Sequence, residues 1–143
     1  MKYWIIVASK DHVDTGIAGG FAQACHGKAN PLKRMSNGDM IIYYSSKKEF
    51  GKNDPYQKFT AIGQISDDEV YEYLTGDNFC PSRIKVNYYH SIDLTIHDIK
   101  DQLQFISDKN RWGYPFRWGI LEINQHDFEL ISIMMKAKTN MDV

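Results

Sequence analysis

The segment from Gly19 to Lys28 constrains this chain most. It combines glycines, an aromatic ring, an amide, a histidine and a cation without any amphipathic period. Glycine loses more backbone freedom on folding than any other residue. Ordering a glycine-rich segment that packs around nothing therefore costs conformational free energy. Loops held by a rigid scaffold are where binding residues concentrate. We therefore expect this segment to bind a ligand, and its residue types suit a flat polar molecule with phosphates nearby.

Size and charge narrow the class of protein. A chain of 143 residues predicts a single domain, residues 1–143, with a core that needs neither disulfides nor metals. With 17 basic against 18 acidic residues, the chain is not a purely electrostatic binder of nucleic acid. The charges are uneven, however, because cations dominate between His26 and Lys58 and acids dominate between Asp67 and Asp101.

The cysteines and the N-terminal apolar run indicate the cellular compartment of the protein. The two cysteines lie far apart in the sequence and fit a reducing cytoplasm better than a disulfide. The N-terminal apolar run over residues 3–8 is too short for a membrane helix and has no cleavage site behind it. We expect a cytoplasmic protein that has neither a membrane partner nor a cofactor.

Local patterns predict short strands and few helices. Strands are expected at residues 3–8, 40–45, 59–65, 83–91 and 118–123, with a shorter one at 70–74 and a bulge at Gly63. Helical turns are expected at 11–16 and 32–35, and a short helix at 96–103. Asn124 is a good N-cap for a final helix, whose first turn contains Asp127. The pattern predicts an α+β domain, a curved sheet or small barrel with helices at its side.

Aromatic and polar residues could form a pocket for a flat base. Aromatic rings can stack on a base or surround a methyl group, and the amide of Gln23 can read a base edge. His26 is a candidate hydrogen bonder, and Tyr114 and Trp118 belong to the same group of rings. The alternative is that Trp4, Tyr43 and Trp118, which lie on expected strands, belong to the core. The predicted pocket consists of Trp4, Ser9, Phe21, Gln23, His26, Tyr43, Tyr44, Trp112 and Phe116.

Cations interleave with these rings, as they do in nucleic-acid binding proteins. Adjacent Cys25 and His26 cannot meet as nucleophile and base, and the histidines lack metal-ligand spacing. We therefore expect neither a catalytic set nor a metal site. The alternative for each cation is an ordinary solvated surface. The predicted phosphate contacts are Lys10, Lys28, Lys33, Arg34, Lys47, Arg111 and Arg117.

The order of motifs resembles the EVE-domain family, a bacterial group related to YTH domains. The resemblance covers nearly the whole chain. It rests on Tyr3-Trp4-Ile5 with Ser9, Gly16, Gly20-Phe21-Ala22-Gln23, Cys25-His26-Gly27-Lys28, Pro31-Leu32, Gly38-Asp39, Tyr43-Tyr44-Ser45, Phe59 to Ile65, Arg111-Trp112-Gly113 and Phe116-Arg117. It implies a PUA-like fold with a strongly curved mixed sheet, short flanking helices and a C-terminal helix.

The same resemblance implies a non-catalytic reader of a modified base in DNA or RNA. YTH domains hold a methylated adenine in an aromatic cage, and base flipping would expose such a base here. The motif of the neighbouring ASCH group, Gly-x-Lys-x2-Glu-x-Arg, is absent, which lowers the chance of that group's hydrolase activity. Two alternatives stay open, a protein-interaction module that uses the basic face and an enzyme acting on RNA or nucleotides. The sequence also leaves open a weak homodimer.

Overall fold

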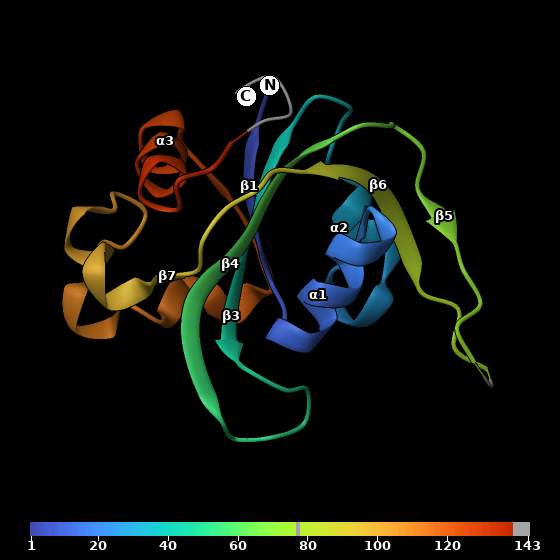
Figure 1. Cartoon of the computed structure of the whole chain (residues 1–143), viewed down its shortest axis with the longest axis horizontal. Coiled ribbons are helices and arrows are strands. Elements are labelled where there is room, and N and C mark those ends of the chain that lie inside the picture. The colour runs from blue at the N-terminus through green and yellow to red at the C-terminus, as the bar shows by residue number, and fades with distance from the viewer. Residues whose placement is uncertain (77, 139–143) are drawn as a thin grey trace.

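A strongly curved mixed β-sheet forms the centre of the protein, and helices cover both of its faces (Figure 1). The structure is a computed structural model that describes residues 1–76 and 78–138. Its strands and α-helices are β1 (Tyr3–Val7), α1 (Lys10–Gly19), β2 (Phe21–Ala22), α2 (Ala29–Lys33), β3 (Met40–Lys47), β4 (Pro55–Ile65), β5 (Tyr71–Glu72), β6 (Ser82–Tyr88), β7 (Leu94–Thr95), β8 (Ile120–Ile123) and α3 (Gln125–Met134). Five 3₁₀ turns complete the described part, namely η1 (Cys25–Gly27), η2 (Ile96–Asp98), η3 (Lys100–Gln102), η4 (Lys109–Arg111) and η5 (Tyr114–Trp118).

The strand order of the sheet is β2-β6-β4-β3-β1-β8, with β5 paired to β6 and β7 paired to β4. Only β1 and β3 run parallel among the pairs of the described chain, and the other pairs are antiparallel. A parallel pair needs a crossover connection. Here that connection contains α1, β2, η1 and α2, so it includes the glycine-rich segment. The predicted α+β class with a curved mixed sheet and a C-terminal helix is confirmed.

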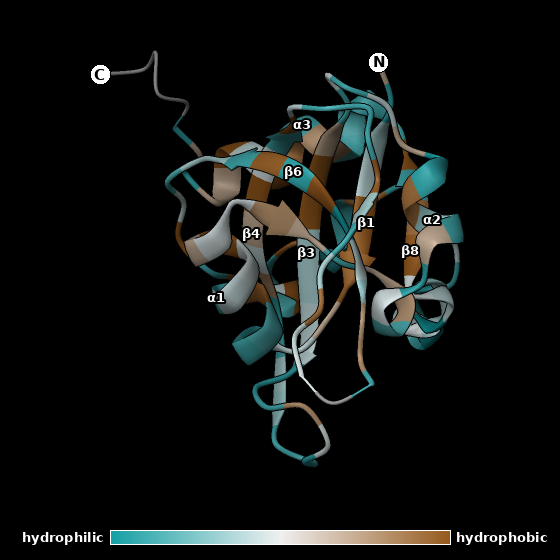
Figure 2. Ribbon diagram, turned by 90° about the vertical axis from the view of Figure 1, so that its right-hand side faces the viewer, coloured by the Kyte–Doolittle hydropathy of each residue, from teal (hydrophilic) through white to brown (hydrophobic). Residues whose placement is uncertain are grey.

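Alternate residues of the central strands enter two separate cores. Trp4 and Tyr43 pack on the face covered by α1 and α2. Ile5 and Tyr44 pack on the other face, against α3 and the segment 94–116. Figure 2 shows the resulting brown, hydrophobic strands between the layers of helix. Because side chains alternate along a strand, two adjacent residues of one strand cannot line one pocket.

Several local predictions need correction. The expected bulge at Gly63 is wrong, because Gly63 pairs in register with Ile41, while the register shifts fall between Tyr43 and Tyr44 and between Ser45 and Lys47. A Cβ at Gly63 would lie 2.6 Å from the carbonyl oxygen of Asn87, so this glycine allows β6 to approach closely. The expected helix at 96–103 is two 3₁₀ turns, η2 and η3. The predicted turn at 11–16 is the longer helix α1.

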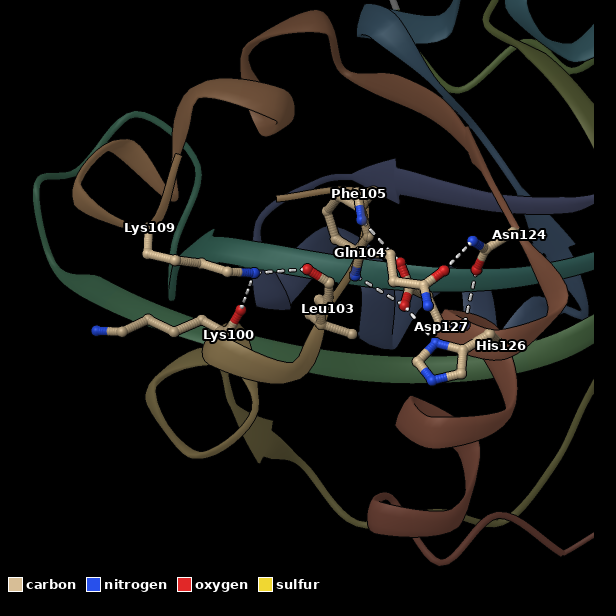
Figure 3. A network of polar contacts seen from close by, with 8 residues as sticks. All are labelled: Lys100, Leu103, Gln104, Phe105, Lys109, Asn124, His126 and Asp127. Atoms are coloured by element: carbon tan, nitrogen blue, oxygen red, sulfur yellow. Dashed lines mark hydrogen bonds and ion pairs between the residues drawn. The ribbon is translucent and has the colours of Figure 1, made fainter. Parts of the chain in front are cut away.

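The predicted cap of the final helix is confirmed, and a buried carboxylate extends it into a network (Figure 3). The side chain of Asn124 accepts the backbone N–H of Asp127 at 2.8 Å. The carboxylate of Asp127, which is fully buried, accepts the backbone N–H groups of Gln104 and Phe105, both at 2.9 Å. The Nζ of Lys109 donates to two nearby carbonyl oxygens of the same loop. This network fixes the 100–109 segment on α3, so Lys109 serves the fold.

No helix in the part of the chain that the structure describes is long and apolar enough to span a bilayer.

Candidate nucleic-acid interface

The chain makes a left-handed turn at Cys25–Gly27, within the segment that the sequence singles out. The φ angles are 49° at Cys25, 62° at His26 and 82° at Gly27. Glycine enters this region freely, whereas other L-residues cost about 1–2 kcal/mol each. Ala24 and Lys28 on either side are extended, so the strain is confined to the turn. Strained backbone is concentrated at ligand sites, which makes this turn the centre of the candidate site.

Two tyrosine hydroxyls hold the segment that leads into the turn. The backbone N–H of Gln23 donates to the hydroxyl of Tyr43 at 3.1 Å, and that hydroxyl donates to the Gln23 carbonyl at 2.9 Å. The hydroxyl of Tyr88 donates to the carbonyl of Phe21 at 2.8 Å. Burial raises the pKa of Tyr43 to about 12 and raises the pKa of Tyr88 as well. Both hydroxyls therefore keep their protons at neutral pH.

Three rings from different segments meet beside the turn. The ring of Phe50 stacks on His12 with 4.9 Å between centroids and meets His26 edge-on at 6.2 Å. The carboxylate of Asp11 accepts the backbone N–H of Phe50 at 3.3 Å and the hydroxyl of Ser9. Although burial raises the pKa of Asp11, these hydrogen bonds lower it overall below its usual range. The charged carboxylate thus ties the Phe50 loop to the start of α1.

Two further segments, at Trp118–Gly119 and at Pro81, pack closely against the turn, and a glycine makes each close approach possible. The Sγ of Cys25 lies 3.9 Å from the carbonyl oxygen of Trp118, and a Cβ added at Gly119 would lie 3.0 Å from that sulfur. A Cβ added at Gly27 would lie 2.7 Å from the Cβ of Pro81. The side chains of Phe50 and Trp118 stay 58% and 65% exposed, so both rings remain available for stacking. We call Ser9, His12, Cys25, His26, Gly27, Phe50 and Trp118 the turn site.

The structure does not bring the nine predicted pocket residues together. Trp4 and Tyr43 lie in one core, and Tyr44 and Phe116 lie in the other with their rings stacked at 3.9 Å. The indole N–H of Trp4 is bonded to buried Asp39. The sheet separates these two pairs, so one pocket made by all of them is not formed. Trp4 and Tyr43 are therefore core residues, as the alternative interpretation states.

Of the remaining predicted pocket residues, Phe21 is buried, whereas the others are partly or fully exposed. Ser9 and His26 belong to the turn site, and Phe21 and Gln23 lead into it. Trp112 instead meets His97 edge-on at 5.3 Å, on the side of the sheet that α3 covers. The expected strand position of Trp118 is wrong, because Trp118 ends η5 and is exposed.

The predicted basic rim divides into paired and exposed cations. The Nζ of Lys10 pairs with Asp14 at 2.8 Å and with Asp93 at 3.7 Å. The guanidinium of Arg34 lies over the Trp4 ring at 5.2 Å. Like Arg34, the other members of the predicted rim are exposed and have no ion pair in the described chain, namely Lys28, Lys33, Lys47, Arg111 and Arg117. The guanidinium groups of Arg111 and Arg117 both lie over the ring of Tyr114.

Sequence reasoning missed His12 and Phe50. One signal pointed to Phe50, since it is the lone apolar residue near the start of the polar loop between β3 and β4. His12 carried no such signal, because its stacking partner lies 38 positions further along the chain. Both cysteines are free, and the described residues contain no group of three or more His, Cys, Asp or Glu arranged for a metal ion.

Comparisons with known proteins identify the family of this chain. Residues 2–134 match the family described as the EVE domain. A Bacillus licheniformis protein named "UPF0310 protein in gntR 5'region" is 51% identical over 123 residues, covering 86% of this chain and 84% of its own length. The UPF0310 protein YdcG of Bacillus subtilis is 41% identical, covering 94% of this chain and 92% of its own.

Solved structures share the fold at low sequence identity. The YTH domain of Zygosaccharomyces rouxii MRB1, in complex with N6-methyladenosine RNA, has a TM-score of 0.64 at 15% identity, covering 99% of this chain and 91% of its own. Human THYN1, in complex with DNA containing 5-methylcytosine, has a TM-score of 0.58 at 11% identity, covering 97% and 100%. The expected PUA-like fold is confirmed.

Proposed function

The chain belongs to the EVE-domain family, and we propose that it is a non-catalytic reader of a modified nucleobase in DNA or RNA. One observation carries the proposal. The strained turn holds the exposed His26 beside Phe50, and Trp118 lies next to the same turn. The two solved neighbours were captured with methylated RNA and methylated DNA, which supports the same class of ligand for this chain.

The turn site has the parts that a base needs. Phe50 and Trp118 offer exposed ring faces, and stacking on such a ring contributes about 1–3 kcal/mol per base. A methyl group buried against the rings adds about 0.8 kcal/mol. The imidazole of His26 and the hydroxyl of Ser9 can each donate or accept a hydrogen bond at a base edge. The site therefore favours a flat base that has left its stack.

The exposed cations supply the contacts to the phosphates that flank this base. Lys28 directly follows the turn, and Lys47 ends β3 immediately before the loop that carries Phe50. Arg111 and Arg117 lie in η4 and η5, the latter ending at Trp118. Lys10 contributes less, since its charge is already paired. The free cysteines fit our placement of the reader in the reducing cytoplasm.

Fluorescence titration tests the proposal, with matched DNA and RNA oligonucleotides that carry plain adenine, N6-methyladenine, plain cytosine or 5-methylcytosine at two salt concentrations. Phe50→Ala is the test variant, and Ile133→Ala is the control because this side chain is 73% exposed on α3. We expect one modified strand to bind best. We expect Phe50→Ala to lose about tenfold in affinity, the stacking of one ring, and Ile133→Ala to bind as the wild type does.

Two outcomes reject the reader, and a third rejects only its assignment to the turn site. Salt-dependent binding without preference for a modified strand would leave a general nucleic-acid module. Absence of binding to every strand would favour the protein-interaction module. An unchanged affinity in a folded Phe50→Ala variant would remove the turn site from the proposal.

A further inference from the structure

Arg83, the second residue of β6, is a buried cation held in an aromatic stack. It is 9% exposed. Its guanidinium carbon lies 3.7 Å from the centroid of the Phe21 ring and 4.4 Å from that of Tyr73. Its Nε–H donates to the Oε1 of Gln23 at 2.7 Å. Two rings and one hydrogen bond therefore fix the orientation of the guanidinium.

This cation has no anionic partner in residues 1–76 and 78–138. No carboxylate in that part of the chain lies within 4.0 Å of Arg83. Buried charges in proteins are normally paired, because removal from water is costly. The two terminal nitrogens have no protein acceptor there, yet they are not among the buried unpartnered atoms, so they reach solvent. The donor edge of a fixed guanidinium thus faces outward with no anion on it.

A phosphate is the anion that this arrangement fits. A guanidinium presents parallel N–H groups that match two phosphate oxygens, and it is weakly hydrated. Since the side chain is already ordered, it loses little further rotamer freedom on binding.

The position of Arg83 places it close to the turn site. Gln23, its hydrogen-bond partner, lies two residues before Cys25. Pro81, two residues before Arg83, is the residue against which Gly27 packs. A nucleotide held at the turn would therefore have its backbone within the neighbourhood of Arg83.

We propose that Arg83 binds a backbone phosphate next to the nucleotide held at the turn site. This inference rests on the proposed function. Further along the same face, Lys85 lines a groove with Asp67 and Glu69, whose negative charges repel a phosphate. The strand of nucleic acid therefore runs from Arg83 toward Lys28, away from that groove.

The test is the salt dependence of binding to plain and modified oligonucleotides, for Arg83→Gln, Arg83→Lys and the control Lys85→Gln. Loss of one phosphate contact lowers the slope of log K against log salt by about 0.7–0.9. We expect this loss in Arg83→Gln on both strands and a wild-type slope in Lys85→Gln. Arg83→Lys keeps the charge but loses the paired N–H donors of the guanidinium. It should therefore bind more weakly than wild type, with a smaller change of slope than Arg83→Gln.

A folded Arg83→Gln protein with the wild-type slope overturns the assignment. The slope on plain strands separates the two proposals. If wild type shows no preference for modified strands but Arg83→Gln still lowers the slope, only the reader is rejected. If Arg83→Gln fails to fold, the Nε–H resonance of wild-type Arg83 is followed instead. We expect a plain oligonucleotide to shift this resonance. A shift with a polyglutamate peptide but none with the oligonucleotide would assign Arg83 to an acidic protein partner and reject the phosphate.

Discussion

Replacing His26 by glycine should stabilise the protein while weakening ligand binding. His26 occupies the left-handed region with φ 62° and ψ 34°. An L-residue there costs about 1–2 kcal/mol, which glycine avoids. Glycine in turn loses about 0.5–1 kcal/mol more to chain entropy on folding. The balance favours glycine by about 0.5–1 kcal/mol, and the lost edge contact with the exposed ring of Phe50 reduces this to about 0.5 kcal/mol or less.

Lys136 provides a matched control for this substitution. It also has a positive φ, 53°, and lies after α3, outside the turn site. Lys136→Gly should therefore gain the full 0.5–1 kcal/mol or so of relieved strain and leave binding unchanged. Urea unfolding monitored by tryptophan fluorescence measures both variants, and oligonucleotide titration measures their affinities. A His26→Gly variant less stable than wild type by about 1 kcal/mol or more would refute a strained turn.

Two other substitutions test the assignment of predicted pocket residues to the core. Tyr44→Phe should raise the unfolding free energy by about 1 kcal/mol in thermal unfolding, because this buried hydroxyl has no partner in the described chain. A lowered melting temperature would contradict this. Asp39→Asn should lower the unfolding free energy by about 2–4 kcal/mol in urea at pH 7, since Asp39 accepts the N–H groups of Trp4, Lys2 and Ser36. Although burial raises the pKa of Asp39, these hydrogen bonds lower it overall below the ordinary 3.8. Its stabilisation is thus complete above that value and is lost as the pH falls through the folded pKa, so wild type and variant should converge in acid; a constant difference would oppose this reasoning.

Much of the fold could be predicted because the signals were local. A continuous apolar run predicts β1, and a capping asparagine predicts the start of α3. The predictions that failed depended on distant partners. Gly63 looks like a bulge in isolation, yet its reason is the backbone of Asn87 from another strand. The 96–103 segment has helical spacing, but it follows the curved surface of the core as two tight turns.

The candidate site was harder to predict because residue type does not reveal the face of a sheet. Tyr43 and Tyr44 are adjacent aromatic residues, and alternation alone sends them into opposite cores. Phe50 and Trp118 become neighbours of the turn only through the folded chain. The sequence could identify the segment that contains the strained turn, because its glycines and polar residues do not follow the periodicity of a helix or a strand.

The buried tyrosines explain how a strained turn can persist. A left-handed Cys25 and His26 together cost about 2–4 kcal/mol. The hydrogen bond within the turn, from the N–H of Gly27 to the carbonyl of Ala24 at 3.0 Å, offsets about 0.5–1.5 kcal/mol of this cost. The hydroxyls of Tyr43 and Tyr88 make three hydrogen bonds to the backbone of Phe21 and Gln23, and each contributes about 0.5–1.5 kcal/mol. These bonds are of the same size as the strain and lie immediately before it. Tyr43 and Tyr88 therefore act on the site by fixing its backbone, and a ligand meets a turn whose ordering has already been completed during folding.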